Sequence, residues 1–269
     1  MVKLIALDLD GTLLDPAGQV QETTKRAIAQ ARRAGVRVVL STGRPIPEAI
    51  WFSHQAGCDS LISCLGGAAL VHGESGEVLR RWDIPEPSAT RALELCLNRE
   101  IELMIFAGDA ILLDPFSKDS LLRTYPYPAF HENAKTVGDP LSYRQEHGLP
   151  LTKIHGDYNP SAYPLAELSA LPGVELTASN EHDFELVPAG VDKGRTLALL
   201  ALLYGVALDD CAAVGDSPND LSMLQVVGTP IAMGNAAQEV KAVARWTTAS
   251  NGEDGVAKAI FACLEGNFS

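Results

Sequence analysis

The chain has 269 residues, of which 46% are hydrophobic and 20% charged; this balance excludes a disordered chain, and the length allows one large domain or two smaller ones. Its 34 acidic residues against 21 lysines and arginines give a net charge of −13, which argues against nucleic acid or an anionic membrane as a partner. A small phosphorylated metabolite stays compatible with this charge, because backbone N–H groups, one lysine and a divalent cation can bind phosphate.

The cysteines and the apolar runs indicate a compartment. The five cysteines are scattered and show no Cys-x-x-Cys spacing, so the sequence predicts neither a disulfide framework nor a zinc site. No apolar run approaches the length of a membrane span, and no basic segment followed by an apolar one opens the chain. We therefore expect a soluble cytoplasmic protein.

Short β-branched runs alternate with segments of helical periodicity at both ends of the chain, which predicts βαβ units and a mostly parallel sheet. The predicted elements are, in chain order, a strand at 3–7, a helix at 22–35, a strand at 36–42, a helix at 192–206, a strand and turn at 211–217, and a helix at 219–227.

The middle of the chain has a different composition. Ten prolines punctuate it between Pro85 and Pro172, around apolar strands such as IELMIFAG and ILL. This shift predicts an inserted α+β domain at 83–187 within a core formed by 1–82 and 188–269.

Four polar motifs fall at predicted strand or helix ends, where open α/β sheets bind their ligands. Together they supply carboxylates, hydroxyl and backbone donors and one ammonium, the groups that metal-assisted phosphoryl transfer requires. The motifs are Asp8 with Asp10, residues 41–44 (STGR), Lys193 with Gly194, and residues 215–220 (GDSPND).

Each motif by itself has a plainer explanation as a turn, a helix cap or a solvated lysine. A calcium loop is excluded by its spacing: counted from Asp8, Leu13 stands where the loop needs glycine and Gln19 where it needs glutamate. The four motifs in order favour phosphoryl transfer, in which one carboxylate attacks phosphorus and a second moves the proton.

The segments DLDGTLL, STGR, KG and GDSPND, in this order, resemble the four signature motifs of the haloacid dehalogenase superfamily of phosphohydrolases. More narrowly, TGRP, GGAAL, FELVPAGVDKG, ASNGEDGVAKAI and the inserted middle domain resemble the Cof-type subfamily with a C2 (IIB) cap. The resemblance implies an α/β protein with a Rossmann-like core, a parallel sheet and an inserted α+β C2-type cap domain.

The resemblance also implies catalytic roles, with Asp8 as the nucleophile and Asp10 as the general acid and base. It assigns phosphate binding to Thr42, Gly43 and Lys193, and Mg²⁺ binding to Asp8, Asp216 and the backbone carbonyl of Asp10.

Supporting and specificity roles complete the expected site. The supporting residues are Thr12, expected to steady Asp10 by a hydrogen bond, Asn219, and Asp220, expected to orient Lys193 or a metal-bound water. We expect substrate specificity from Arg44 and from cap side chains near strand ends, for which we select Lys153, Ser179, Asn180 and Glu181. Gly66 stands where the subfamily often has asparagine, so any contact of that side chain is open.

The expected function is Mg²⁺-dependent hydrolysis of small phosphomonoesters, above all sugar phosphates, through an aspartyl-phosphate. A phosphatase of pyridoxal phosphate or FMN, and a phosphomutase using the same two aspartates, are the alternatives. The presence of Asp10 disfavours a non-catalytic binding protein, and a dehalogenase would need neither Mg²⁺ nor this second aspartate. The sequence does not determine the oligomeric state.

Overall fold

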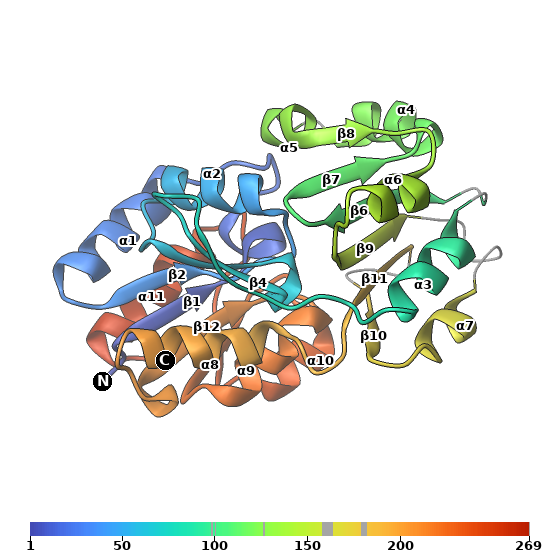
Figure 1. Ribbon diagram of the computed structural model, residues 1–269. Coiled ribbons are helices and arrows are strands. Elements are labelled where there is room, and N and C mark those ends of the chain that lie inside the picture. Colours follow the sequence, from blue (N-terminus) through green and yellow to red (C-terminus); the bar gives the residue numbers. More distant parts are fainter. Residues whose placement is uncertain (98, 100, 126, 158–163, 179–181, 269) are drawn as a thin grey trace. The chain divides into compact units, whose positions relative to one another are not determined.

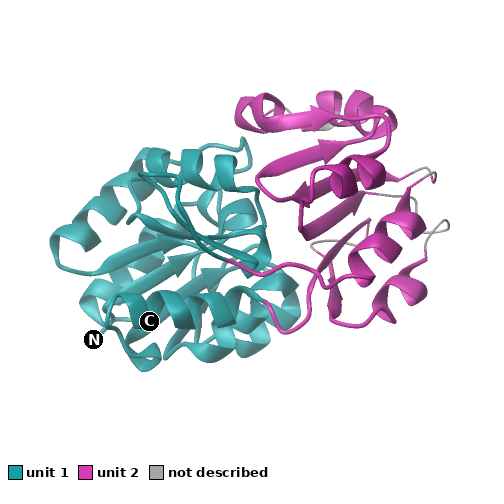
Figure 2. Cartoon of the chain, viewed as in Figure 1, with its two compact units in different colours: residues 1–80, 192–269 teal, residues 81–191 magenta. Residues whose placement is uncertain are grey.

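The structure, a computed structural model, describes residues 1–97, 99, 101–125, 127–157, 164–178 and 182–268. The chain divides into two compact units (Figure 2): a core unit of residues 1–80 and 192–269, and an inserted unit of residues 81–191. The predicted domain boundaries, with an insertion at 83–187, stay a prediction; that insertion lies inside the second unit.

The core unit is built on a five-stranded parallel sheet (Figure 1). Its strands are β1 (Leu4–Leu7), β2 (Arg37–Leu40), β12 (Cys211–Gly215), β13 (Thr229–Ala232) and β14 (Trp246–Thr247). Their order in the sheet is β14-β13-β12-β1-β2. Strands β1 and β12 are apolar and buried along their whole length, which is typical of parallel strands covered on both faces. Leu7 pairs with Leu40 on one side and Val214 on the other, so these three strands end level with one another.

Helices cover this sheet because their apolar residues recur with helical spacing. In α1 (Glu22–Arg33) the buried side chains are Thr24, Ala27, Ile28 and Ala31, which form one stripe along the helix. Helix α1 packs against α11 (Gly255–Glu265), and α8 (Lys193–Leu203) packs against α9 (Leu221–Val226). This unit also contains α2 (Ile46–Ala56) and α10 (Gln238–Val243).

A three-stranded sheet continues the core unit beyond β2. It consists of β3 (Leu61–Cys64), β4 (Ala69–His72) and β5 (Val78–Arg81), with β3 antiparallel to β4. A parallel bridge between Ser41 and Ser63 joins β3 to the chain just after β2. The segment after β2 is therefore held between two strands.

The inserted unit contains a six-stranded sheet with the order β10-β11-β9-β6-β7-β8. Its strands are β6 (Glu102–Ala107), β7 (Ala110–Leu113), β8 (Ala134–Thr136), β9 (Leu151–Asp157), β10 (Val174–Thr177) and β11 (Asp183–Pro188). All neighbouring pairs are antiparallel except β7 with β8.

Side chains alternate across this sheet. One apolar core contains Leu103, Ile105, Ile154, Phe184 and Leu186 together with residues of α3 (Ser88–Cys96) and α7 (Leu165–Ser169). This unit also contains α4 (Pro115–Thr124), α5 (Pro128–Asn133) and α6 (Pro140–Glu146).

The structure contains the parallel sheet and the α+β middle region that the sequence predicts. The predicted helix at 219–227 is divided into a single tight turn at Pro218–Asp220 and α9. No helix in the described part of the chain is both long and apolar enough for a membrane span.

The packing of the inserted sheet can be tested at Gly156. A Cβ atom there would lie 2.4 Å from Cε1 of Phe184, so Gly156→Ala is expected to lower the free energy of unfolding of this unit by about 1–3 kcal/mol. Gly138→Ala is the matched control, because nothing lies within 4 Å of its added Cβ. Denaturant unfolding of both variants measures the effect, and equal stabilities would contradict the packing described here.

Candidate active site

The core motifs meet at one edge of the parallel sheet. Asp8 follows β1, the STGR segment follows β2, and Asp216 follows β12. These three strands are neighbours and run in the same direction, so their carboxyl ends place the three segments side by side. Lys193 is the first residue of α8 and joins them through its side chain.

The Lys193 ammonium lies at the centre of this site. Nζ donates to Oδ1 of Asp8 at 2.7 Å, to Oδ1 of Asp220 at 2.6 Å and to Oδ1 of Asn219 at 3.1 Å. The Lys193 side chain is 1% exposed, and those of Asp8 and Asp220 are 6% and 0% exposed. The sequence predicts that Asp220 orients either Lys193 or a metal-bound water, and it gives Asn219 only a general supporting role. The structure brings both residues to the ammonium.

Burial and crowded charges shift the acid–base properties of these groups. Burial alone would lower the pKa of the Lys193 ammonium, but Asp220 and Asp8 beside it raise that pKa above its ordinary value. Burial and the neighbouring Asp220 carboxylate raise the pKa of Asp8 well above its ordinary value, against the opposing effect of Lys193. Burial and Asp220 likewise raise the pKa of Asp216 to about 6. The site therefore carries more negative charge than one lysine neutralises.

A wide turn at Leu9–Leu13 carries the chain away from Asp8. It is closed by a hydrogen bond from the Leu14 N–H to the Leu9 carbonyl, and Gly11 has a φ of +76°. A Cβ at this glycine would lie 2.3 Å from Oδ2 of Asp216, so both the backbone conformation and the space require glycine. The Asn235 amide donates to the Gly11 carbonyl at 2.8 Å and holds the turn from outside.

Thr12 differs from the sequence-based expectation. Its hydroxyl donates to Oδ1 of Asp216 at 3.2 Å, so it steadies Asp216 and not Asp10. The reason is geometric: the Asp10 carboxylate is turned toward Arg44, which donates to both of its oxygens.

A metal site fits these residues. Asp8, Asp216 and Asp220 each offer a carboxylate oxygen within 4.8 Å of the others. Both oxygens of Asp220 already accept hydrogen bonds, Oδ1 from Lys193 and Oδ2 from the backbone N–H groups of Asp216 and Ser217. Asp8 and Asp216 are thus the carboxylates best placed to hold a cation, and one or two carboxylates are what Mg²⁺ usually takes from a protein.

The expected phosphate-binding segment is held firmly. Thr42 is fully buried; its N–H donates to the Ser63 carbonyl at 2.9 Å, and its hydroxyl accepts from the Arg44 N–H at 3.1 Å. The Gly66 N–H donates to the Thr42 carbonyl at 3.0 Å, and Gly66 has a φ of +71°. Glycine, or the asparagine often found at this place in the subfamily, adopts this left-handed conformation at low cost.

Arg44 lies within the core site. Its Nε and one terminal nitrogen donate to the two oxygens of Asp10 at 2.8 and 2.6 Å, and the other terminal nitrogen donates to Glu48 at 2.7 Å. Sequence reasoning missed Glu48. An acidic residue four positions after an arginine could have drawn attention to it.

Lys153 lies in the sheet of the inserted unit. It is buried, and Nζ contacts Oε1 of Glu185 at 2.5 Å. Burial alone would raise the pKa of Glu185, but Lys153 and His155 hold it well below its usual range. Burial would lower the pKa of His155, but Asp157 and Glu185 raise it to about 9. Lys153 is thus one member of a charged network; the other selected cap positions, Ser179, Asn180 and Glu181, lie outside the described residues.

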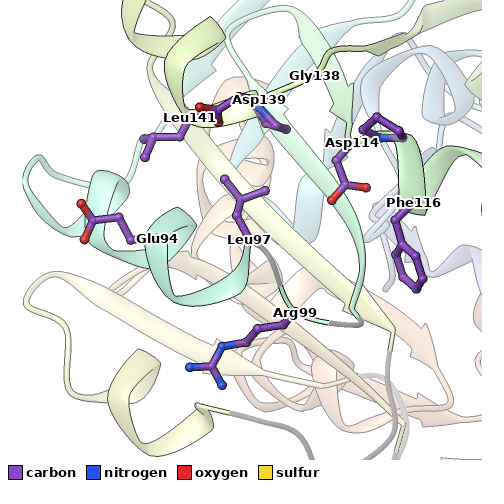
Figure 3. A pocket seen from close by; sticks show the side chains of 10 residues that line it. Glu94, Leu97, Arg99, Asp114, Phe116, Gly138, Asp139 and Leu141 are labelled. Carbon is purple, nitrogen blue, oxygen red and sulfur yellow. The ribbon is translucent and has the colours of Figure 1, made fainter.

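A cavity of about 710 Å³ lies in the inserted unit between the end of α3 and the starts of α4 and α6 (Figure 3). Asp114 and Asp139, which line it, cap helices: they accept hydrogen bonds from the N–H groups of Ser117 and Leu141. None of the expected site residues that the structure describes lines this cavity. We therefore place the candidate active site at the sheet edge, where the motifs meet.

The raised pKa of Asp216 has a consequence for stability. Because this carboxyl holds its proton more tightly in the folded state, its contribution to stability is fully present below its ordinary pKa of 3.8 and is lost as the pH rises through about 6. Metal-free protein should therefore lose stability from about pH 4 to about pH 7 more steeply than Asp216→Asn.

Added Mg²⁺ should restore stability of the unaltered protein at the upper end of this range, because a cation favours the ionised carboxylate. Thermal unfolding with a chelator and with Mg²⁺ measures both effects. If the stability of the unaltered protein and of Asp216→Asn changed with pH in the same way, ionisation of Asp216 would not be the cause of the loss.

Comparisons with known proteins show the family to which the chain belongs. A family model described as haloacid dehalogenase-like hydrolase matches residues 5–260. The 5-amino-6-(5-phospho-D-ribitylamino)uracil phosphatase of Bacillus subtilis is 31% identical over 294 residues, covering 100% of both chains.

Two solved structures share the architecture. A haloacid dehalogenase-like hydrolase from B. subtilis has a TM-score of 0.84 at 28% identity and covers 97% of this chain and 99% of its own. A subclass IIB sugar phosphatase has a TM-score of 0.83 at 22% identity, covers 97% and 100%, and speaks for the fold alone. The predicted fold class is confirmed, and the chain belongs to the haloacid dehalogenase-like hydrolases.

Proposed function

We propose that this chain hydrolyses small phosphomonoesters through an aspartyl-phosphate on Asp8, with sugar phosphates as the substrate class. Membership of the family and a full-length relative named as a phosphatase support a phosphoric monoester hydrolase. The observation that carries the intermediate is the contact of buried Asp8 with Lys193 at 2.7 Å, at the edge of the sheet where ligands bind.

In the first step an oxygen of Asp8 attacks phosphorus. Among the described residues, the side-chain donor to Asp8 is Lys193, and it contacts Oδ1, which leaves Oδ2 for the attack. The bond from phosphorus to the ester oxygen breaks, and its electron pair stays on that oxygen. Asp10 supplies the proton that the leaving alcohol needs.

In the second step a water molecule attacks the phosphoryl group on Asp8. Asp10 takes the proton from this water, and the bond between phosphorus and Asp8 breaks, which returns the Asp8 carboxylate and releases inorganic phosphate. Lys193, the Thr42 hydroxyl and Gly43 hold the phosphoryl oxygens through both steps. Asp220 and Asn219 keep the ammonium in place.

Asp8, Asp216 and the backbone carbonyl of Asp10 would hold Mg²⁺. When bound, the ion neutralises charge between the nucleophile and the phosphoryl oxygens. The protein itself places the carboxylates of Asp8 and Asp216 close together, and the pKa of each is raised. A cation between them would reduce their electrostatic repulsion. Gly11 leaves the space that Asp216 occupies.

The proposed substrate class follows from the relative. Its named substrate carries a phosphate on a ribityl chain, which is a reduced sugar. FMN also carries its phosphate on a ribityl chain, so it belongs in the same test, together with pyridoxal phosphate. Because the alkoxide of a sugar is a poor leaving group, such a substrate depends on proton transfer by Asp10.

Asp8→Asn is expected to reduce phosphate release by roughly 1,000-fold or more, because the amide keeps the shape but is not a nucleophile. Chelation should abolish release by the unaltered protein, and Mg²⁺ should restore it. The measurement is free phosphate from a panel of sugar phosphates, FMN and pyridoxal phosphate.

Asp209→Asn is the matched control, since this aspartate is exposed in the same unit and should leave activity unchanged. Equal release by Asp8→Asn and the unaltered protein would refute the proposed intermediate. Conversion of a sugar phosphate to its isomer without free phosphate would identify a phosphomutase instead.

A further inference from the structure

The Arg44 guanidinium bridges two carboxylates of very different exposure. One edge of its planar fork donates to both oxygens of Asp10, and the remaining terminal nitrogen donates to Oε2 of Glu48. The Asp10 side chain is 52% exposed, whereas those of Arg44 and Glu48 are 11% and 1% exposed. The buried carboxylate that pairs with Arg44 is therefore Glu48, whereas Asp10, the proposed catalytic group, is the exposed one.

Glu48 is well placed to hold the guanidinium. It lies in the first turn of α2, where the helix dipole stabilises a negative charge. The Arg44 backbone is also fixed, because its N–H donates to the Thr42 hydroxyl and its carbonyl accepts from the Leu65 N–H at 3.0 Å. The head and the backbone of Arg44 are thus both held by residues other than Asp10.

The difference in exposure between Asp10 and Glu48 indicates whether Arg44 orients Asp10 or Asp10 orients Arg44. An ion pair between exposed groups has little power to fix geometry. A planar fork that is desolvated and already held by a buried carboxylate presents its two remaining donors in a fixed direction. Asp10 can therefore be oriented by Arg44, whereas Arg44 does not depend on Asp10 for its place.

We propose that Glu48 and Arg44 are positioning residues that set the orientation of the Asp10 carboxyl group for proton transfer. The inference rests on the proposed function, in which Asp10 is the general acid and base. It gives Arg44 a role other than the substrate recognition predicted from the sequence. While Asp10 carries the proton, the protonated oxygen turns from Arg44 to the reacting oxygen, and the other oxygen keeps its hydrogen bond from Arg44 and holds the carboxyl group in place.

The test compares two leaving groups in single-turnover phosphorylation of the enzyme. The sugar phosphate that the unaltered protein turns over fastest leaves as an alkoxide and needs the proton from Asp10, whereas p-nitrophenyl phosphate leaves without it. Glu48→Gln is expected to slow the sugar phosphate by roughly 10- to 100-fold and p-nitrophenyl phosphate by no more than about twofold. Arg44→Lys should show the same selectivity, because lysine keeps the charge but lacks the fork.

Asp59→Asn is the matched control. Asp59 is another buried carboxylate of the core unit, and its side-chain partners in the described part of the chain are Arg32, Arg37 and the Val38 N–H, so its loss should affect both substrates alike. Equal slowing of both substrates in Glu48→Gln, or full activity of Arg44→Lys on the sugar phosphate, would overturn the positioning role.

Failure of the proposed function gives a different result. If the unaltered protein releases no phosphate in an Asp8-dependent manner, both the function and this inference are overturned. If that release is present and the selectivity of Glu48→Gln is unchanged, this inference alone falls. Crystal structures of the unaltered protein and Glu48→Gln add a readout without catalysis: we expect the contact between Arg44 and Asp10 in the first and its loss in the second, and its absence in the first would overturn the inference.

Discussion

The site depends on the contacts that the buried Lys193 ammonium makes with the side chains around it. The ammonium bonds Asp8, which is 185 residues away in the chain, together with Asn219 and Asp220. A cation in the first turn of a helix opposes the helix dipole, so helix stability alone does not explain a lysine there. The neighbouring carboxylates offset this cost, and without the lysine they would be buried charges with no counter-charge. The lysine therefore offsets the electrostatic cost of burying several aspartates at this sheet edge. One lysine does not neutralise all of them, and a divalent cation would neutralise the remaining negative charge.

Precision in the rest of the site comes from backbone geometry more than from side-chain packing. The wide turn after Asp8 needs a positive φ and an absent Cβ at Gly11, because Asp216 fills the space. Asp220 accepts from the N–H groups of Asp216 and Ser217, so the residue that orients Lys193 also shapes the loop that carries Asp216, a proposed metal ligand. Asn235 contacts the Gly11 carbonyl and accepts from the Asn251 N–H, which links this turn to the C-terminal part of the chain. One residue often serves two neighbours here, so single substitutions should alter several contacts together.

Arg44 and Lys153 show how a charged side chain can pair with a carboxylate that the sequence analysis did not select. Substrate recognition is the role predicted from the sequence for Arg44, which lies just beyond Thr42, and for Lys153, a polar residue near a predicted strand end. Arg44 instead bridges Asp10 and Glu48, and Lys153 contacts Glu185 within a network that includes His155. Burying a charge is tolerated where an opposite charge meets it, and both residues satisfy that condition within their own unit.

The sequence by itself determined the parallel core and predicted an inserted region and the candidate catalytic groups, because buried strands, helical periodicity and the four motifs are local signals along the chain. Asp8, Lys193 and Asp216 could be selected in this way, since each follows a recognisable strand or begins a helix. Only the tertiary structure decided which partner each side chain takes. The Thr12 hydroxyl reaches Asp216 and not the nearby Asp10, and Glu48 and Asn235 enter the site although neither belongs to a motif. Thr12 and Asp216 lie 204 residues apart in the sequence, and Asn235 and Gly11 lie 224 residues apart, so residue type and spacing do not encode these contacts.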